Sequence, residues 1–264
     1  RKRIPTYHME AGNRCFDANV PEETNRRLVD HTADFNLAYT EHARRNLLAE
    51  GLHPRRIIVT GSPMTEVLDA NQDAIEASTA LTDLGVEPGQ YFLVSAHREE
   101  NVDSPERLRS LLACLNAVAG DWELPVLVST HPRTRKRLEQ VQDTPISELV
   151  RFHEPFGFLD YNRLQMSAAC VLSDSGTIAE ESTILGFPAV TLRSSIERPE
   201  ALDTGAITMT DLDPAAVLRG IRFAEGRGAA PERPADYQIT NTSARVVNFI
   251  LSTAFQHEFW SGLR

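Results

Sequence analysis

Cysteine, long hydrophobic runs and positive charge are all in short supply in this 264-residue sequence, and each shortage excludes a class of protein. The three cysteines are odd in number and widely spaced, which argues against a disulfide framework or a zinc site and favours reduced thiols in the cytoplasm. No run approaches the roughly 20 apolar residues that a membrane helix requires. The net charge of −10 argues against a general role in binding nucleic acid or a membrane surface, so local positive groups must bind any anionic ligand.

What the sequence does contain is a repeated alternation of short apolar runs and helical patterns. The runs expected to be strands are residues 4–9, 35–39, 56–60, 91–96, 125–130, 149–153, 168–172 and 189–192. The helices expected between and after them cover residues 21–28, 41–50, a segment from Met64, 105–118, 134–141, 160–167, a segment ending at Gly186, 214–224 and 243–259. Near-continuous apolar strands that alternate with helices indicate parallel sheets covered on both faces. The fold class predicted is therefore α/β, with two doubly wound parallel-sheet domains.

The domain boundaries follow from composition. The polar segment 71–90 is rich in Asp, Glu, Thr and Gly and is typical of an inter-domain link. We therefore expect a first domain at residues 1–78, a second at 79–242 and a terminal helix within 243–264. That helix is expected to present one apolar face, made of Val246, Val247, Ile250, Leu251 and Phe255.

The stretch 173–181, Ser-Asp-Ser-Gly-Thr-Ile-Ala-Glu-Glu, is the strongest candidate for a ligand site. It follows an apolar run and opens a helical pattern, and the first N–H groups of a helix bind anions readily. Ser175 and Thr177 add hydroxyl donors, while Gly176 lets a phosphate approach the backbone. Glu181 lies one turn further on, where its carboxylate could accept from a ribose diol. The alternative is an ordinary helix cap by Ser175.

Other chemically useful side chains fall at the carboxyl ends of the predicted strands, the edge where open α/β sheets bind ligands. They are Glu10, His97, Arg98, His131, Ser175, Arg193, Arg198 and Glu200. His97 could stabilise a departing diphosphate, or it could bond a backbone carbonyl as a loop histidine. His131 is either a ligand group or part of a strand-to-helix turn. The two arginines, Arg193 and Arg198, could clamp phosphate or could be solvated loop charges. The shared location of these groups favours a phosphate site over a plain cap.

Glu10 and Glu22 are the candidates for acid–base chemistry. Glu10 directly follows an apolar strand, with a structural role as the alternative. Glu22 lies in the first turn of the helix expected from Pro21, where an acidic residue is favoured even without a catalytic role. The remaining histidines show no paired-ligand spacing, so no metal site is predicted.

Taken together, these motifs resemble the non-hydrolysing UDP-N-acetylglucosamine 2-epimerase family. The matching stretches are His8-Met9-Glu10-Ala11-Gly12, Pro21-Glu22-Glu23-Thr24-Asn25-Arg26, Thr60-Gly61-Ser62-Pro63, Ser95-Ala96-His97-Arg98-Glu99, Asp174-Ser175-Gly176-Thr177 with Glu180-Glu181, and Glu197-Arg198-Pro199-Glu200. Three further stretches, residues 13–17, 129–135 and 157–162, look most like the branch that makes UDP-N-acetyl-L-fucosamine for capsule and O-antigen polysaccharides.

The resemblance implies a GT-B-like pair of Rossmann-like domains, with UDP held mainly by the second and a final helix packed back on the first. It also implies a homodimer and a first domain truncated on its N-terminal side, by roughly a hundred residues, since half of a normal Rossmann domain is missing. The substrate implied is a UDP-2-acetamido sugar, either UDP-N-acetylglucosamine or UDP-2-acetamido-2,6-dideoxy-L-talose. The implied catalytic residues are Glu10, Glu22 and His97, and the implied substrate-binding residues are Arg98, His131, Ser175, Gly176, Thr177, Glu181 and Arg198.

The expected reaction is a C2 epimerisation that requires no metal and no other cofactor. The hydrogen at C2 is not next to a carbonyl, so UDP must leave C1 before or while a carboxylate removes the C2 proton. Two alternatives remain open at this stage. One is a GT-B glycosyltransferase, which needs an acceptor, and the other is a UDP-binding remnant without activity.

Overall fold

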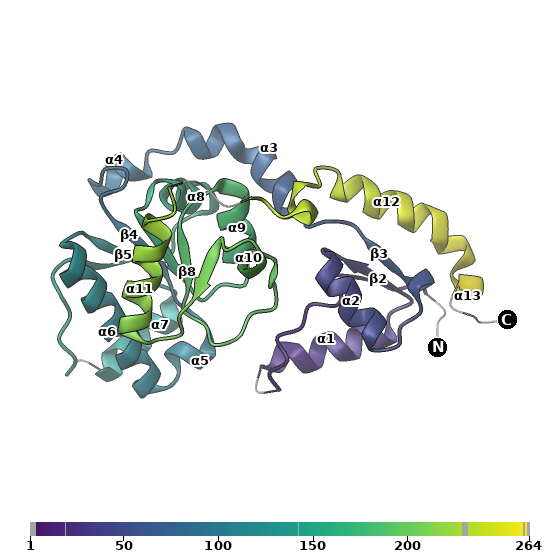
Figure 1. Cartoon of the computed structure of the whole chain (residues 1–264), viewed down its shortest axis with the longest axis horizontal. Coiled ribbons are helices and arrows are strands. Elements are labelled where there is room, and N and C mark those ends of the chain that lie inside the picture. The colour runs from purple at the N-terminus through teal and green to yellow at the C-terminus, as the bar shows by residue number, and fades with distance from the viewer. Residues whose placement is uncertain (1–3, 19, 142, 229–231, 261, 263–264) are drawn as a thin grey trace. The chain divides into compact units, whose positions relative to one another are not determined.

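A computed structural model describes residues 4–18, 20–141, 143–228, 232–260 and 262. The chain forms two compact units, which are considered separately (Figure 1). Unit 1 comprises Arg1–Ala70, Ser195–Glu200 and Arg233–Arg264, and unit 2 comprises Asn71–Ser194 and Ala201–Glu232. None of the helices in the described ranges combines the length and the hydropathy that crossing a membrane requires.

Unit 1 is built on a parallel sheet of the order β1-β2-β3. Its strands are β1 (Tyr7–Met9), β2 (Phe35–Ala38) and β3 (Ile57–Val59). Its helices are α1 (Pro21–Thr32), α2 (Glu41–Ala49), η1 (Pro54–Arg56), most of α3 (Met64–Glu76), η3 (Ala235–Gln238), α12 (Thr242–Thr253), η4 (Ala254–Gln256) and α13 (His257–Trp260). Thr40 caps α2 by accepting from the Ala43 N–H at 3.3 Å.

Helices cover both faces of this sheet. Ala38 of β2 packs with Ala43 and Leu47 of α2 on one face. On the other face, Phe35 and Leu37 of β2 pack with Val246 and other apolar side chains of α12, and Figure 1 shows α12 running alongside β2 and β3. Alternate residues of one short strand therefore bury their side chains in two different clusters, which is the pattern of a parallel sheet enclosed on both sides.

The sequence prediction for the terminal helix was partly wrong. Val246 is buried against the sheet, but Val247, Leu251 and Phe255 are 55%, 67% and 93% exposed. These exposed residues form a neighbouring stripe of the helix, and Phe249, not in the predicted set, takes their place at the sheet. The helix also ends at Thr253, where η4 begins.

A left-handed turn follows β1, and Gly12 within it has a φ of 84°. A Cβ atom at Gly12 would lie 2.2 Å from the backbone oxygen of Ala43 in α2, so the backbone itself is in the way. Gly51 has a similar φ of 85°, but a Cβ atom there would meet nothing within 4 Å. A side chain at either position would be strained by the left-handed backbone, but only a side chain at Gly12 would also clash with neighbouring atoms.

Gly12→Ala should destabilise unit 1 by about 3 kcal/mol or more, because it combines a left-handed alanine with a clash against packed backbone. Gly51→Ala should cost only about 1 kcal/mol, since only the backbone strain applies. Urea unfolding followed by Trp260, whose ring lies 6.4 Å from that of Phe35, measures unit 1 if Trp122 of unit 2 is replaced by phenylalanine. Equal losses for the two glycines would contradict the packing argument.

Unit 2 is a parallel sheet of the order β6-β5-β4-β7-β8-β9. Its strands are β4 (Phe92–Ser95), β5 (Val126–Ser129), β6 (Val150–His153), β7 (Cys170–Ser173), β8 (Ala189–Thr191) and β9 (Ile207–Met209). Its helices are the end of α3, then α4 (Ala80–Leu84), α5 (Glu99–Val102), α6 (Pro105–Trp122), α7 (Pro132–Leu138), η2 (Glu139–Val141), α8 (Phe158–Ser167), α9 (Ile178–Leu185), most of α10 (Glu200–Asp203) and α11 (Pro214–Glu225). The predicted α/β class with parallel sheets is confirmed.

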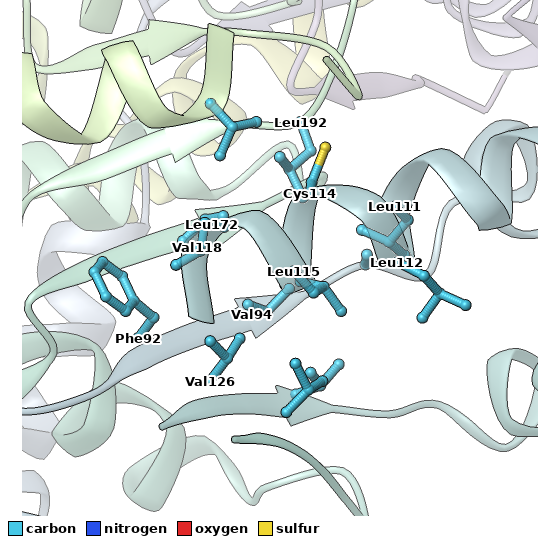
Figure 2. Close-up of a cluster of buried hydrophobic side chains, with 14 of the residues drawn as sticks. Phe92, Val94, Leu111, Leu112, Cys114, Leu115, Val118, Val126, Leu172 and Leu192 are labelled. Carbon is cyan, nitrogen blue, oxygen red and sulfur yellow. The ribbon is translucent and has the colours of Figure 1, made fainter. Parts of the chain in front are cut away.

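The two faces of this sheet each support a buried cluster. Phe92 and Val94 of β4 point to the side covered by α6 and α11, and Figure 2 shows α6 laying Leu112, Leu115 and neighbouring side chains across the strands. Tyr91 and Leu93 belong to the other cluster, which α8 and α9 cover. A sheet covered on both sides forms a rigid frame for the loops at its strand ends.

Two local expectations differ from the structure. The polar segment 71–90 begins at the boundary between the units, but α3 continues into it as far as Glu76 and α4 follows, so two helices occupy much of it. Ile75 explains this difference, because it is 1% exposed and gives the segment a buried helical face. The short edge strand β9 was not expected, since its three residues carry too little apolar pattern.

Candidate functional site

The strand order of unit 2 identifies a preferred ligand position. From β4 the chain proceeds through β5 to β6 on one side, and from β7 it proceeds through β8 to β9 on the other. In open α/β sheets ligands bind at the carboxyl ends of the two strands where this direction reverses. Here those strands are β4 and β7, which pair in register from Phe92–Cys170 to Ser95–Ser173.

Asp174 joins the two loops at this position. Its buried carboxylate accepts from the backbone N–H groups of His97 and Arg98 at 3.0 Å and from the Asn101 amide at 3.1 Å. The Nδ1 atom of His97 lies 3.5 Å from the same carboxylate, and the His97 side chain is 48% exposed. Asp174 therefore fixes the backbone of the β4 loop while the imidazole of His97 stays accessible to a ligand.

The Ser175–Thr177 segment opens α9. Ser175 Oγ lies 2.9 Å from Thr177 Oγ1 and accepts from the Thr177 N–H at 3.3 Å. The helix begins at Ile178 with Thr177 as its N-cap, and the Thr177 side chain makes no capping hydrogen bond. Ser175 lies two residues before this N-cap, and its Oγ binds the N–H of the N-cap residue itself and not an N–H of the helix. Ser175, Gly176 and Thr177 are partly exposed at the helix start, beside the His97 loop.

Glu181 lies one turn into α9 and is already oriented. Its Oε2 accepts from the Gln165 amide at 2.7 Å. The hydroxyl of Tyr161 bonds Ser95 and Gln165, and burial, together with the nearby Glu181 and Asp174 carboxylates, raises the pKa of Tyr161. The phenol thus remains neutral at physiological pH and adds a polar group to this edge of the sheet.

The other two candidates of unit 2 have different surroundings. His131 follows β5 and its Nδ1 accepts from the Arg133 N–H at 3.2 Å, which is the geometry of the strand-to-helix turn considered from the sequence. Arg193 follows β8, is 1% exposed and has its Nε 3.9 Å from Glu100 Oε1. Arg193 is therefore no solvated loop charge.

Unit 1 holds its own cluster, centred on Glu10. The Glu10 carboxylate accepts from Arg198 Nη2 at 2.6 Å and from the Asn13 amide at 3.2 Å, and Arg26 Nη2 lies 3.7 Å away. Arg26 also pairs with the buried Glu197 at 3.6 Å. The segment Ser195–Glu200 belongs to this unit although only three residues separate it from the end of β8 in the other unit.

Glu22, the second predicted carboxylate, is exposed in the first turn of α1. Its neighbour Glu23 is the buried one, and it accepts from the Cys15 N–H at 2.9 Å and pairs with Arg27 at 2.8 Å. Of these two adjacent acidic residues, Glu23 therefore has a structural role and Glu22 has a carboxylate that solvent can reach. The catalytic assignment of Glu22 stays a prediction.

A buried arginine supports the loop that carries Glu10. The Arg14 side chain is fully buried and donates to both carboxylate oxygens of Glu50, each at 2.8 Å. Hydrogen bonds from Arg14 and then from His31 outweigh the effect of burial and lower the pKa of Glu50 to about 2.

The depressed pKa of Glu50 predicts an acid-sensitive contribution to stability. Because this pKa is about 2 in the folded state and 4.5 ordinarily, ionised Glu50 stabilises the fold above pH 4.5 and the contribution is lost as pH falls towards 2. At pH 7 the free energy of unfolding of the wild type should be larger than that of Glu50→Gln. This difference in free energy should shrink by about 3 kcal/mol as the pH is lowered towards 2. Urea titrations followed by Trp260 fluorescence at a series of pH values measure this difference. A difference that does not change with pH would contradict the lowered pKa of Glu50.

Several residues at these positions were not predicted. Asp174 and Arg26 lie inside recognised motifs but were not assigned to a site, and Asn101 and Asp30 were not considered. The sequence shows Asp174 as an acidic residue between an apolar strand and Ser175, but only the pairing of β7 with β4 reveals that its carboxylate faces the loop of the neighbouring strand. Within the described ranges, no three His, Cys, Asp or Glu side chains converge in a way that could hold a metal ion.

Comparison with known proteins agrees with this architecture. A family model described as UDP-N-acetylglucosamine 2-epimerase matches residues 1–251. The UDP-N-acetylglucosamine 2-epimerase of Methanocaldococcus jannaschii is 37% identical over 210 residues, which cover 77% of this chain and 57% of that protein.

Two solved structures are similar throughout the chain. The structure of UDP-N-acetylglucosamine 2-epimerase from Rickettsia bellii aligns with a TM-score of 0.84 and 39% identity, covering 96% of this chain and 69% of that one. The M. jannaschii UDP-GlcNAc 2-epimerase in complex with UDP-GlcNAc and UDP aligns with a TM-score of 0.87 and 30% identity, covering 94% and 69%. The chain spans less than two thirds of the length of the curated relatives it matches. By the extent of the family match and the level of identity, this chain belongs to the UDP-N-acetylglucosamine 2-epimerase family.

Proposed function

We propose that this chain forms part of an isomerase that inverts C2 of a UDP-2-acetamido sugar by eliminating UDP and adding it back. The observation that carries the proposal is the Asp174 carboxylate, which holds His97 and the Ser175–Thr177 helix start together at the strand-order reversal of unit 2. Family membership supports the reaction class, and the sugar nucleotides named for the M. jannaschii structure support the ligand class.

In this proposal the diphosphate is bound by unit 2. The N–H groups at the start of α9, the Ser175 and Thr177 hydroxyls and the Arg98 guanidinium supply donors for phosphate oxygens. The exposed His97 imidazole donates to the diphosphate as the C1–O bond breaks, when negative charge grows on the leaving group. Fixed donors aimed at developing charge stabilise a transition state more than a ground state. Glu181 accepts from the ribose diol, and His131 adds a further ligand contact.

The proton transfer needs a carboxylate. Once C1 has oxocarbenium character, a carboxylate removes the C2 proton, and the C–H electron pair forms the C1–C2 double bond of a glycal. Return of a proton to the opposite face of C2 and of UDP to C1 completes the inversion, so atoms and electrons balance without a redox partner. Glu10 and Glu22 are the two carboxylates proposed for the two faces, and Arg198 contacts both Glu10 and, in this proposal, substrate.

The resemblance to the fucosamine branch supports finer proposals. The substrate is UDP-N-acetylglucosamine or UDP-2-acetamido-2,6-dideoxy-L-talose, and the product feeds capsule or O-antigen synthesis in the cytoplasm. The working enzyme is proposed to be a homodimer of chains with two Rossmann-like domains. In each chain residues 1–78 belong to the catalytic domain, residues 79–242 bind UDP and residues 243–264 pack back on the first domain.

Proton exchange tests the reaction. Incubation with each UDP-sugar in deuterated water, without any acceptor, should place deuterium at C2 of substrate and product, as read by NMR. Retention of the original hydrogen with epimerisation would refute the glycal route. UDP binding by calorimetry without C2 exchange would favour the UDP-binding remnant, and sugar transfer only on addition of an acceptor would favour a glycosyltransferase.

A further inference from the structure

One buried carboxylate ties together the loop that carries Glu10. Asp30, in the last turn of α1, is 0% exposed. Its Oδ1 lies 2.7 Å from His8 Nδ1, while its Oδ2 accepts from the Gly12 N–H at 3.2 Å and from Arg14 Nη2 at 2.7 Å. These three partners of Asp30 lie before, within and after the turn at Glu10.

The turn itself requires such restraint. Glu10 has a φ of 61° and Gly12 a φ of 84°, so two of three successive residues are left-handed. For a residue with a side chain this conformation is strained and persists only where the surroundings enforce it. Two other hydrogen bonds to the turn join neutral groups, namely a 3.3 Å bond from the Ala11 N–H to the Leu37 oxygen and a 3.0 Å bond from the Asn46 amide to the Gly12 oxygen, and bonds between neutral groups are generally weaker than those to a carboxylate.

We propose that Asp30 is a positioning residue for Glu10: by anchoring His8, Gly12 and Arg14 it holds the left-handed turn that keeps the Glu10 carboxylate against Arg198. The catalytic side of this inference rests on the proposed function, while its structural side does not. A carboxylate suits this position because the Gly12 N–H and Arg14 Nη2 both donate to Oδ2, while His8 Nδ1 lies within hydrogen-bond distance of Oδ1. A neutral amide would have to direct its own N–H groups at one of them.

Asp30→Asn is the direct test, and Asp34→Asn is a matched control. Asp34 is also buried, at 4% exposure, and it binds the opposite end of the same strand by accepting from the N–H and hydroxyl of Thr6, each at 3.0 Å. Both variants lose one buried carboxylate next to β1. Only Asp30→Asn loses contacts to the turn.

The first measurement is the kinetic constants for C2 epimerisation of the UDP-sugar. Asp30→Asn should lower kcat by about 10- to 100-fold, because a displaced catalytic group reacts slowly even when substrate is bound. KM should change less than about twofold, since the turn binds no part of the UDP in our proposal. Asp34→Asn should leave kcat within about twofold. An equal loss of kcat in both variants would mean that Asp30 supports the fold in general and does not position Glu10, which would overturn the inference.

The second measurement does not depend on catalysis. Amide hydrogen exchange of peptides spanning residues 10–14 should be at least about tenfold faster in Asp30→Asn than in Asp34→Asn at matched global stability. Unchanged protection of these amides would overturn the inference, whatever the activity. Should Asp30→Asn not fold, His8→Ala removes one of the three partners of Asp30 and should give a smaller change in the same direction. Failure of wild type to exchange the C2 proton would instead count against the proposed function.

Discussion

Replacing Glu10 by glutamine should lower C2 proton exchange by about 10²- to 10⁴-fold, the usual range for loss of a general base. Glutamine matches the size of glutamate and can still accept from Arg198 and Asn13, which lie 2.6 and 3.2 Å from the carboxylate. The substitution therefore removes basicity with little change in packing. Exchange at C2, measured by NMR in deuterated water, reports this step directly.

The binding of UDP separates a chemical defect from a folding defect. Because the diphosphate is assigned to unit 2, Glu10→Gln should bind UDP by calorimetry within about twofold of wild type. Glu41→Gln is the matched control, since Glu41 is another carboxylate of unit 1, 44% exposed, whose ion pairs go to Arg44 and Arg45. Activity of Glu10→Gln within a few-fold of this control would move the base role to Glu22.

The sequence was most informative about the strand ends of unit 2. Apolar runs that stop at small or polar residues predicted the β4 and β7 loops, and the structure brings His97 and Ser175 to neighbouring positions there. Local pattern suffices for this, because in a parallel sheet every strand presents its carboxyl end at the same edge. The strand order itself was not predictable, since β4 and β7 pair across a separation of 78 residues in the register Phe92–Cys170.

Contacts across long separations explain most of what the sequence did not reveal. Asp174 is recognisable as a site residue only when β7 is known to pair with β4, and Glu10 meets Arg198 across 188 positions.

The terminal helix shows a different limit of prediction from sequence. Val246 and Val247 are adjacent and equally apolar, so the period of the helix cannot decide which of two neighbouring stripes meets the sheet, and tertiary packing decides it.

His97→Ala should lower turnover by about 10²-fold or more, while the affinity for UDP falls much less. The alanine variant isolates the imidazole, because the bonds from His97 to Asp174 that hold the loop come from the backbone N–H. The side chain is 48% exposed, so its removal leaves no buried cavity.

His97→Ala should affect turnover more than UDP affinity because negative charge on the departing UDP develops only during the reaction. In the proposed site, a diphosphate bound in the ground state already accepts from the helix start and from the Ser175 and Thr177 hydroxyls, whereas additional charge reaches the bridging oxygen only as the C1–O bond breaks. A donor aimed at that oxygen therefore acts on kcat more than on binding. His53→Ala is the control, since His53 is an exposed histidine that accepts from the Arg55 N–H at 3.1 Å in η1 of unit 1. Turnover of His97→Ala close to that of His53→Ala would mean that another donor stabilises the departing UDP.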